Sequence, residues 1–226
     1  MAVLTWDAVG DHLYETGTRN GVLYKQKPDG TYDTGVAWNG LTAVTESPSG
    51  AEETALYADD QKYLSMRSLE EFGGTIEAYT YPDEFAECDG SADVGGAVFG
   101  QQKRTPFGFC FRTVLGNDTQ LDDHGYKLHI WYGCTASPSE RSYQSVNDSP
   151  DAITFSWEVT TQPVAVTAQG AAGMKPVACI TIDSTKADST KLETLKGWLY
   201  GTEGTGTADG TDPRLPTPAE IYTLFA

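Results

Sequence analysis

Few side chains in this sequence have the types and spacing that catalysis or metal binding requires. The three histidines are His12, His124 and His129, and His124 follows two acidic residues in the run Asp122-Asp123-His124. A metal site needs several ligands at matched spacing, and no second pair of histidine and carboxylate stands at such a spacing. We therefore interpret the run as a solvated turn at a hairpin tip. His129 lies on a predicted strand, which favours a packed or surface histidine over a catalytic base.

The sequence carries no motif of a known catalytic site. It has neither a GxSxG nucleophile elbow nor a GxxxxGK[ST] phosphate loop. The acidic pairs Glu52-Glu53, Asp59-Asp60 and Glu70-Glu71 have the residue type of glycosidase carboxylates, but 32 acidic residues make chance pairs expected. A triad whose members meet only in space stays open at this level. We expect no catalytic, cofactor-binding or metal-binding residue, no cofactor, and a protein that is not an enzyme.

The four cysteines predict free thiols rather than a disulfide or zinc site. Cys88, Cys110, Cys134 and Cys179 form no CxxC pair, and their gaps exceed zinc-site spacing. The N-terminus has no basic segment followed by an apolar one, so we expect synthesis in a cytosol. In that reducing compartment we expect free and mostly buried thiols.

The chain is strongly acidic, with a formal net charge of −17. Ordinary binding to duplex DNA is disfavoured, because phosphate neutralisation needs clustered lysines and arginines. An anionic membrane surface is a poor partner for the same reason. The acidity either keeps the monomer soluble or provides a wall along which a polyanion slides without binding.

The elements that would position any site are mainly strands. Alternation with a period of two predicts a strand with one buried face. In one such segment Phe107, Phe109 and Phe111 share a face. Two further faces consist of Tyr126, Leu128, Ile130, Tyr132 and Cys134, and of Ile153, Phe155, Trp157 and Val159. Residues 75–81 and 176–182 are additional strand candidates.

One helix is predicted near residues 190–200. Thr190 and Glu193 have the spacing of a capping box, and Gly201 stands where a left-handed C-terminal cap belongs. A weaker helical pattern covers residues 63–72, which also fits a strand. The leucines of the stronger helix line one face: Leu192, Leu195 and Leu199.

These patterns predict three regions. Residues 1–35 are expected to form an N-terminal arm or hairpin, with a turn at Pro28-Asp29-Gly30. Residues 36–201 are expected to form the body. Residues 202–226 read as an extension rich in Gly, Thr and Pro that ends in a docked apolar terminus. The expected fold is mainly β, an antiparallel sandwich or partly closed barrel with one flanking helix.

The block from Trp38 to Gly90 contains a series of short motifs in a defined order. Each alone fits a turn, a strand stop or a core anchor. In combination they resemble the signature block of the major tail tube proteins of bacteriophages with long, flexible tails, in particular those of Gram-positive hosts. The likeness extends over most of residues 14–200. The motifs are Trp38-Asn39-Gly40-Leu41, Ser47-Pro48-Ser49-Gly50, Tyr57-Ala58-Asp59, Lys62-Tyr63 and Tyr79-Thr80-Tyr81-Pro82-Asp83-Glu84-Phe85.

The resemblance implies a structural role in a virion, with assembly in the host cytoplasm. Proteins of that family have a β-sandwich flanked by a helix, with an extended N-terminal arm and inter-strand loops. They form hexameric rings that stack into a tube around a tape-measure protein, and the tube later conducts DNA into the host. The implied partners are further copies of the chain, the tape-measure protein, the tail terminator, and baseplate or distal tail proteins. DNA would pass through the lumen without specific binding.

The resemblance also suggests which residues build the interfaces. Glu77 is expected to face the lumen, because it alternates with Ile76 and Ala78 on a predicted strand. Deletion of residues 1–35 is expected to leave a folded body that no longer stacks. The residues expected in ring and inter-ring contacts are Trp38, Asn39, Tyr57, Asp59, Tyr63, Tyr81, Asp83 and Phe85.

An alternative function is a carbohydrate-binding β-sandwich of a host-recognition protein. The chain is rich in aromatic residues, and Trp131 and Trp157 are candidates for stacking on sugar rings. Glycan binding by an isolated monomer would favour this alternative. Turnover that depends on a single carboxylate would instead favour a glycoside hydrolase.

Overall fold

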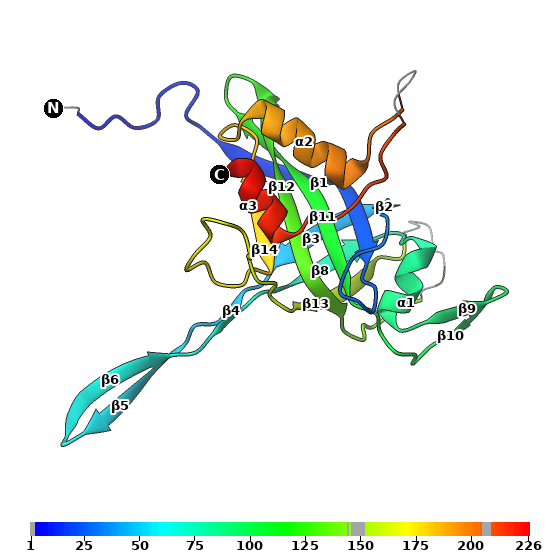
Figure 1. Ribbon diagram of the computed structural model, residues 1–226, viewed down its shortest axis with the longest axis horizontal. Helices are drawn as coiled ribbons and strands as arrows, with labels where there is room; N and C mark the ends of the chain where they lie inside the picture. The colour runs from blue at the N-terminus through cyan, green and yellow to red at the C-terminus, as the bar shows by residue number, and fades with distance from the viewer. Residues whose placement is uncertain (1–2, 144, 146–151, 205–208) are drawn as a thin grey trace.

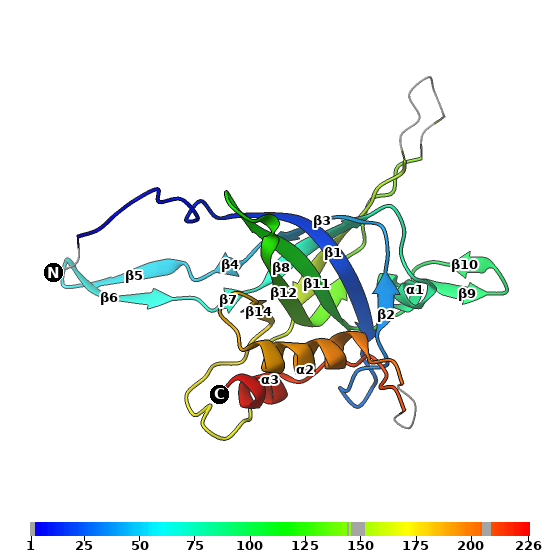
Figure 2. The same cartoon turned by 90° about the horizontal axis from the view of Figure 1, so that it is seen from above.

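A computed structural model describes residues 3–143, 145, 152–204 and 209–226, which form a curved antiparallel sheet with two helices over one face (Figures 1 and 2). The eight-stranded sheet has the order β2-β1-β11-β12-β13-β8-β3, and β14 pairs with β12 beside this path. The expected β-rich antiparallel fold is confirmed. In the described part of the chain no hydrogen-bonded ladder joins the end strands β2 and β3, so the sheet is not a closed barrel.

The strands of the main sheet are β1 (Tyr14–Lys25), β2 (Val36–Trp38), β3 (Leu41–Glu46), β8 (Gly73–Ala78), β11 (Phe107–Asn117), β12 (Leu121–Ala136), β13 (Phe155–Thr161) and β14 (Cys179–Asp183). Three small pairs lie outside it: β4 (Ser49–Gly50) with β7 (Glu70–Glu71), β5 (Glu53–Ala58) with β6 (Gln61–Arg67), and β9 (Ala92–Val94) with β10 (Ala97–Phe99). The helical elements are the 3₁₀ turn η1 (Asp83–Phe85), α1 (Ala86–Asp89), α2 (Ser189–Tyr200) and α3 (Pro218–Phe225).

The main sheet buries apolar side chains on both of its faces. On the face away from the helices, the three phenylalanines of β11 pack with the indoles of Trp38, Trp131 and Trp157. On the other face, Tyr24 and Tyr132 pack beneath α2 and α3. The predicted faces of β11 and β13 are confirmed, although β13 begins at Phe155 and leaves Ile153 outside the strand. The two helices therefore cover one core, and the curvature of the sheet encloses the other.

A bulge in β12 overturns one predicted face. Phe109 pairs with Trp131 whereas Phe107 pairs with Cys134, so one extra residue of β12 is inserted between these two pairs. Gly133 supplies the conformation, with a φ of 58° that favours glycine. Cys134 consequently lies in the cluster of Trp131, not in the cluster of Tyr132 as the strict alternation predicted.

Helix α2 confirms the predicted element but not its cap. The N-cap is Asp188, whose carboxylate accepts hydrogen bonds from the backbone N–H groups of Thr190 and Lys191. The predicted capping box between Thr190 and Glu193 is therefore wrong. Gly201 has the expected positive φ, 76°, but its ψ of 173° is not that of a left-handed helical cap. The leucine face is confirmed, since Leu192, Leu195 and Leu199 are buried.

The boundary predicted for the N-terminal arm is too long. Residues 14–25 form β1, which pairs with β11 along its length and with β2 near its end. Leu23 and Tyr24 are fully buried. Only residues 3–13 extend away from the sheet (Figure 2). Deletion of residues 1–35 would remove β1 together with the buried Leu23 and Tyr24, so the structure gives reason to expect that the remaining body does not fold.

The C-terminal extension docks on the body. Leu215 and Ile221 are buried in the core beneath the helices. Helix α3 begins with a complete capping box between Thr217 and Glu220. The docked apolar terminus is therefore confirmed, and residues 205–208 of the predicted linker lie outside the described residues. Residues 63–72, which fitted either a helix or a strand, form strands β6 and β7.

Candidate assembly interface

The β5–β6 hairpin carries large apolar side chains away from the body (Figures 1 and 2). The side chains of Tyr57 and Tyr63 are both 73% exposed, and Met66 is 58% exposed. No residue of the hairpin is buried. An isolated two-stranded hairpin is marginally stable in water, and exposed apolar groups of this density mark contact surfaces. The hairpin therefore has the properties of an element that becomes buried against a partner.

The N-terminal arm is a second exposed apolar element. Val3, Leu4 and Trp6 all expose most of their surface. The base of the arm is attached to the turn between β11 and β12: the backbone N–H of Gly10 donates to the Asp118 carboxylate at 3.0 Å, and His12 Nδ1 lies 3.1 Å from the same group. The hydrogen bond from His12 lowers the pKa of Asp118. The arm is thus anchored at its base and presents apolar side chains beyond it.

The β9–β10 hairpin is a third projection. Val94, Val98 and Phe99 are exposed along its two short strands. Its turn residues, Gly95 and Gly96, both have positive φ, as a tight hairpin requires. The sequence analysis did not predict this hairpin, although a Gly-Gly pair between apolar residues is a pattern that indicates one.

Two of the expected interface residues belong to the core. Trp38 and Phe85 are buried, with ring centroids 4.5 Å apart. The Trp38 indole N–H donates to the Thr80 carbonyl at 3.0 Å. Tyr81 is half-buried and packs edge-on against Phe155 and Trp157. Trp38 and Phe85 therefore have no surface to offer a neighbouring subunit.

The other expected residues are accessible, but they lie in separate places. Tyr57, Asp59 and Tyr63 belong to the β5–β6 hairpin, whereas Asp83 lies exposed in η1. Asn39 is exposed beside β2. Glu77 is half-buried on β8 and alternates with the buried Ile76 and Ala78. The structure thus collects three of these residues on one projection and does not bring the remaining accessible ones to it.

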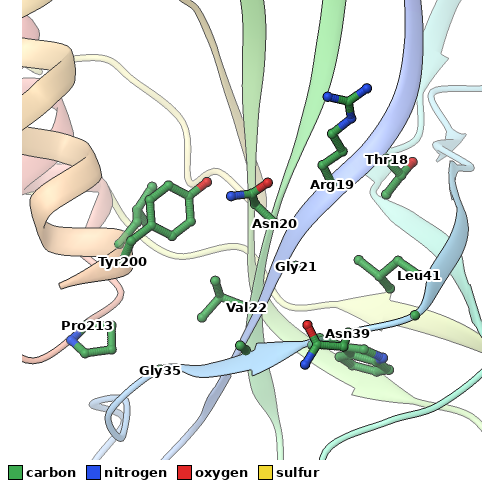
Figure 3. Close-up of a pocket in the computed structure, with 14 residues that line it drawn as sticks. Thr18, Arg19, Asn20, Gly21, Val22, Gly35, Asn39, Leu41, Tyr200 and Pro213 are labelled. Atoms are coloured by element: carbon green, nitrogen blue, oxygen red, sulfur yellow. The ribbon is translucent and has the colours of Figure 1, made fainter.

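Asn39 lies on the wall of a cavity of about 590 Å³ (Figure 3). The cavity is located where β1, β2 and the end of α2 meet. Its polar lining includes Arg19 and Asn20 from β1 and Tyr200 from α2. No local sequence pattern predicts this site, because its walls come from positions far apart in the chain.

The sheet also buries a polar cluster around His129. Its Nε2 lies 3.0 Å from the Thr113 hydroxyl, and its Nδ1 lies 3.5 Å from a Glu46 carboxylate oxygen. The imidazole stacks on Phe111 at 4.6 Å. Burial lowers the pKa of His129, although Glu46 and Glu15 oppose the shift. His129 is a packed histidine, as predicted.

The remaining candidates for chemistry are structural. Asp122 accepts a hydrogen bond from the Tyr14 hydroxyl at 2.9 Å, and His124 lies 2.8 Å from the Gln120 side chain. The acidic run lies at the start of β12, directly after the turn at residues 118–120, and not in the turn itself as predicted. Within the described ranges no group of three His, Cys, Asp or Glu side chains is arranged to hold a metal ion. The four cysteines are free thiols, and Cys179 is the one that is not fully buried.

The chain matches no family model and no curated protein. No helix in the described part of the chain has the length and apolar character needed to cross a bilayer.

Proposed function

We propose that this chain is the structural subunit of a phage tail tube, which polymerises as stacked hexameric rings around a tape-measure protein and forms the conduit for DNA ejection. The resemblance of the Trp38–Gly90 block suggests the family. In this proposal the chain acts in the virion, after assembly in the host cytoplasm, and contacts the tail terminator and distal tail proteins at the ends of the tube.

The observation that carries the proposal is the exposure of apolar side chains on three separate projections. The β5–β6 hairpin and the N-terminal arm leave one side of the body and diverge in Figure 1, and the β9–β10 hairpin leaves the opposite side (Figures 1 and 2). Their exposed side chains include Trp6, Tyr57 and Phe99. A subunit that contacts several neighbours needs several contact surfaces, and exposed apolar side chains mark such surfaces.

Free strand edges support the same function. Within the described residues, β3 pairs with β8 alone, and β2 covers only Gly21, Val22 and Leu23 of β1. Unpaired edges are sites where another chain adds a strand. Adjacent copies would use these edges to continue the sheet from one subunit to the next.

The acidity supports a conduit. With 32 acidic residues against 15 basic ones, the net charge of the chain repels phosphates. A lumen with such a wall would let DNA pass without binding. Glu77 remains our candidate for a residue that faces the lumen.

The structure weakens the original support for a carbohydrate-binding module. Trp131 and Trp157 are both fully buried, so neither ring is available to stack on a sugar. The carbohydrate-binding module is therefore kept only as a possible result of the experiment described next.

Negative-stain electron microscopy and sedimentation velocity of the purified full chain test the proposal. We expect rings or tubes that become more abundant as the protein concentration rises. A strict monomer at every concentration, salt and pH condition would overturn the proposal. Glycan binding by that monomer would favour the alternative function.

A further inference from the structure

Two arginines occupy an unusual position beside the cavity of Figure 3. Arg19 of β1 stands directly opposite Arg112 of β11 in the ladder. Like charges at directly opposed positions destabilise a sheet. Among the described residues neither guanidinium has a carboxylate within 4.0 Å, in a chain that has about two acidic residues for each basic one.

The surroundings of the arginine pair contain further unsatisfied polar groups. Arg112 packs over the Tyr126 ring at 4.1 Å, and its Nε is buried without a hydrogen-bond partner. The hydroxyl of Tyr200 is also buried without a partner. Figure 3 shows this hydroxyl and the Asn20 amide turned toward each other at the cavity. Buried polar groups without partners are costly. Of the two residues with such groups, Tyr200 lines the cavity, whereas Arg112 lies behind its wall, opposite Arg19.

The backbone of β1 adds donors to the same wall. Strand β2 ends its pairing at Gly21, so β1 has no described partner on that side at Thr18, Arg19 and Asn20. These three residues line the cavity. A group that fills the cavity can therefore meet the Arg19 guanidinium, the Asn20 amide and the unpaired edge of β1 together, and charged and amide donors of this kind recognise a carboxylate.

The complementary charges lie at the tip of the β5–β6 hairpin. Ala58 pairs with Gln61, so the loop consists of Asp59 and Asp60 alone. Their φ values are 50° and 60°. A turn with two positive φ values favours Asn-Gly or Asp-Gly, and neither aspartate forms an ion pair within the described residues. The tip thus presents two exposed carboxylates in a turn that a glycine at the second position would adopt more easily.

We propose that the cavity beside Arg19 is a carboxylate-binding site, and that its occupant is the Asp59-Asp60 tip of a second copy of this chain. The inference rests on the proposed self-assembly and names one of its contacts. In the same copy the tip lies far from β1 and β2 in both views, so a neighbouring copy must supply it (Figures 1 and 2). A cavity of about 590 Å³ is within the range of ligand pockets, roughly 300–1,000 Å³.

The contact is tested by removing the charge either from the hairpin tip or from Arg19. The tip variant is chosen so that its turn still forms. The variant Asp59→Asn with Asp60→Gly removes both carboxylates and installs the most favourable residues for this turn. Arg19→Asp reverses the charge at an exposed position. Sedimentation velocity of the full chain should show that each change raises the concentration for half-maximal assembly by about tenfold or more.

A charge swap separates this contact from general repulsion. Asp59→Lys with Asp60→Lys should impair assembly alone, and combination with Arg19→Asp should restore it to within about threefold of the wild type. The matched controls Lys103→Asp and Asp123→Arg change the net charge at exposed positions elsewhere and should leave assembly unchanged.

The outcomes distinguish this inference from the proposed function. If the wild type assembles and both Arg19→Asp and the Asn-Gly variant assemble equally well, the carboxylate site is overturned. The tube proposal would still stand. A swap that gives no rescue would count against the pairing of these two surfaces. A wild type that never assembles would overturn both.

Discussion

The rings of Trp38 and Phe85 lie in contact, with centroids 4.5 Å apart and planes inclined by 52°. Both come from the block that resembles a tail tube signature, and both are buried. In the same block Tyr57 and Tyr63 project into solvent. One continuous stretch of sequence therefore supplies both the centre of the core and a projecting surface.

This division predicts two separable effects of mutation. Phe85→Ala should lower the free energy of unfolding by about 3–5 kcal/mol, because it leaves a cavity among aromatic rings. Tyr57→Ser with Tyr63→Ser should change it by less than about 0.5 kcal/mol per site and raise the concentration needed for assembly. Urea unfolding and sedimentation velocity measure the two quantities. Normal assembly by the double tyrosine variant would contradict the interface.

The N-terminal arm should be dispensable for folding but not for assembly. Deletion of residues 1–8 removes exposed apolar residues and leaves the contact of Gly10 with Asp118. We expect an unchanged unfolding midpoint and weaker self-association. Deletion of residues 1–25 removes β1 and should give an unfolded chain by circular dichroism. A folded product of the longer deletion would show that β1 is not needed in the sheet.

His129 should make stability depend on pH. Burial favours the neutral imidazole, so its pKa lies below the ordinary 6.5 in the folded protein despite the opposing carboxylates of Glu46 and Glu15. The unfolded chain then binds the proton first as pH falls. The free energy of unfolding should decrease from about pH 7 to pH 5, and its loss should be complete below the folded pKa.

Chemical denaturation of the wild type and of His129→Gln across this range tests the assignment. Glutamine keeps a polar group beside the Thr113 hydroxyl but does not titrate. The variant should have a shallower dependence on pH between these limits. Identical slopes for the two proteins would assign the effect to other groups.

The thiols should be unreactive until the protein unfolds. Burial raises the pKa of Cys88 and Cys110 to about 12. At pH 8 roughly one such thiol in ten thousand is the reactive thiolate. Reaction with Ellman's reagent should therefore be at least about a hundredfold slower in the native protein than in guanidinium. Rapid native labelling of more than the half-buried Cys179 would contradict this packing.

Local patterns predicted much of the fold because each reflects a nearby physical cause. Alternation placed the three phenylalanines of β11 on one face, and leucine spacing located α2. The same reasoning failed where one residue altered the register. The bulge at Gly133 moves Cys134 to the opposite face, and Asp188 caps α2 in place of Thr190 because its carboxylate reaches two free N–H groups.

The candidate sites were harder to predict because they depend on exposure and on distant positions. An aromatic residue in a sequence motif can be buried, as Trp38 is, or exposed, as Tyr57 is, and the motif does not indicate which. The opposition of Arg19 and Arg112 arises only when β1 pairs with β11. Such a relationship requires the sheet order, which no local pattern contains.

The branching of the sheet at β12 has a consequence for how the subunit folds. Residues 127–131 of β12 pair with β14, and residues 134–136 pair with β13. Strands β11 and β12 are adjacent in sequence and can pair as a local hairpin. Strands β1, β8 and β14 are far from their partners in sequence, so their pairing is non-local. Such non-local pairing is slow, on the order of milliseconds to seconds. Before these distant strands pair, the edges of the β11–β12 hairpin would be exposed in a newly made chain. Association of these edges with other newly made chains would then compete with correct folding.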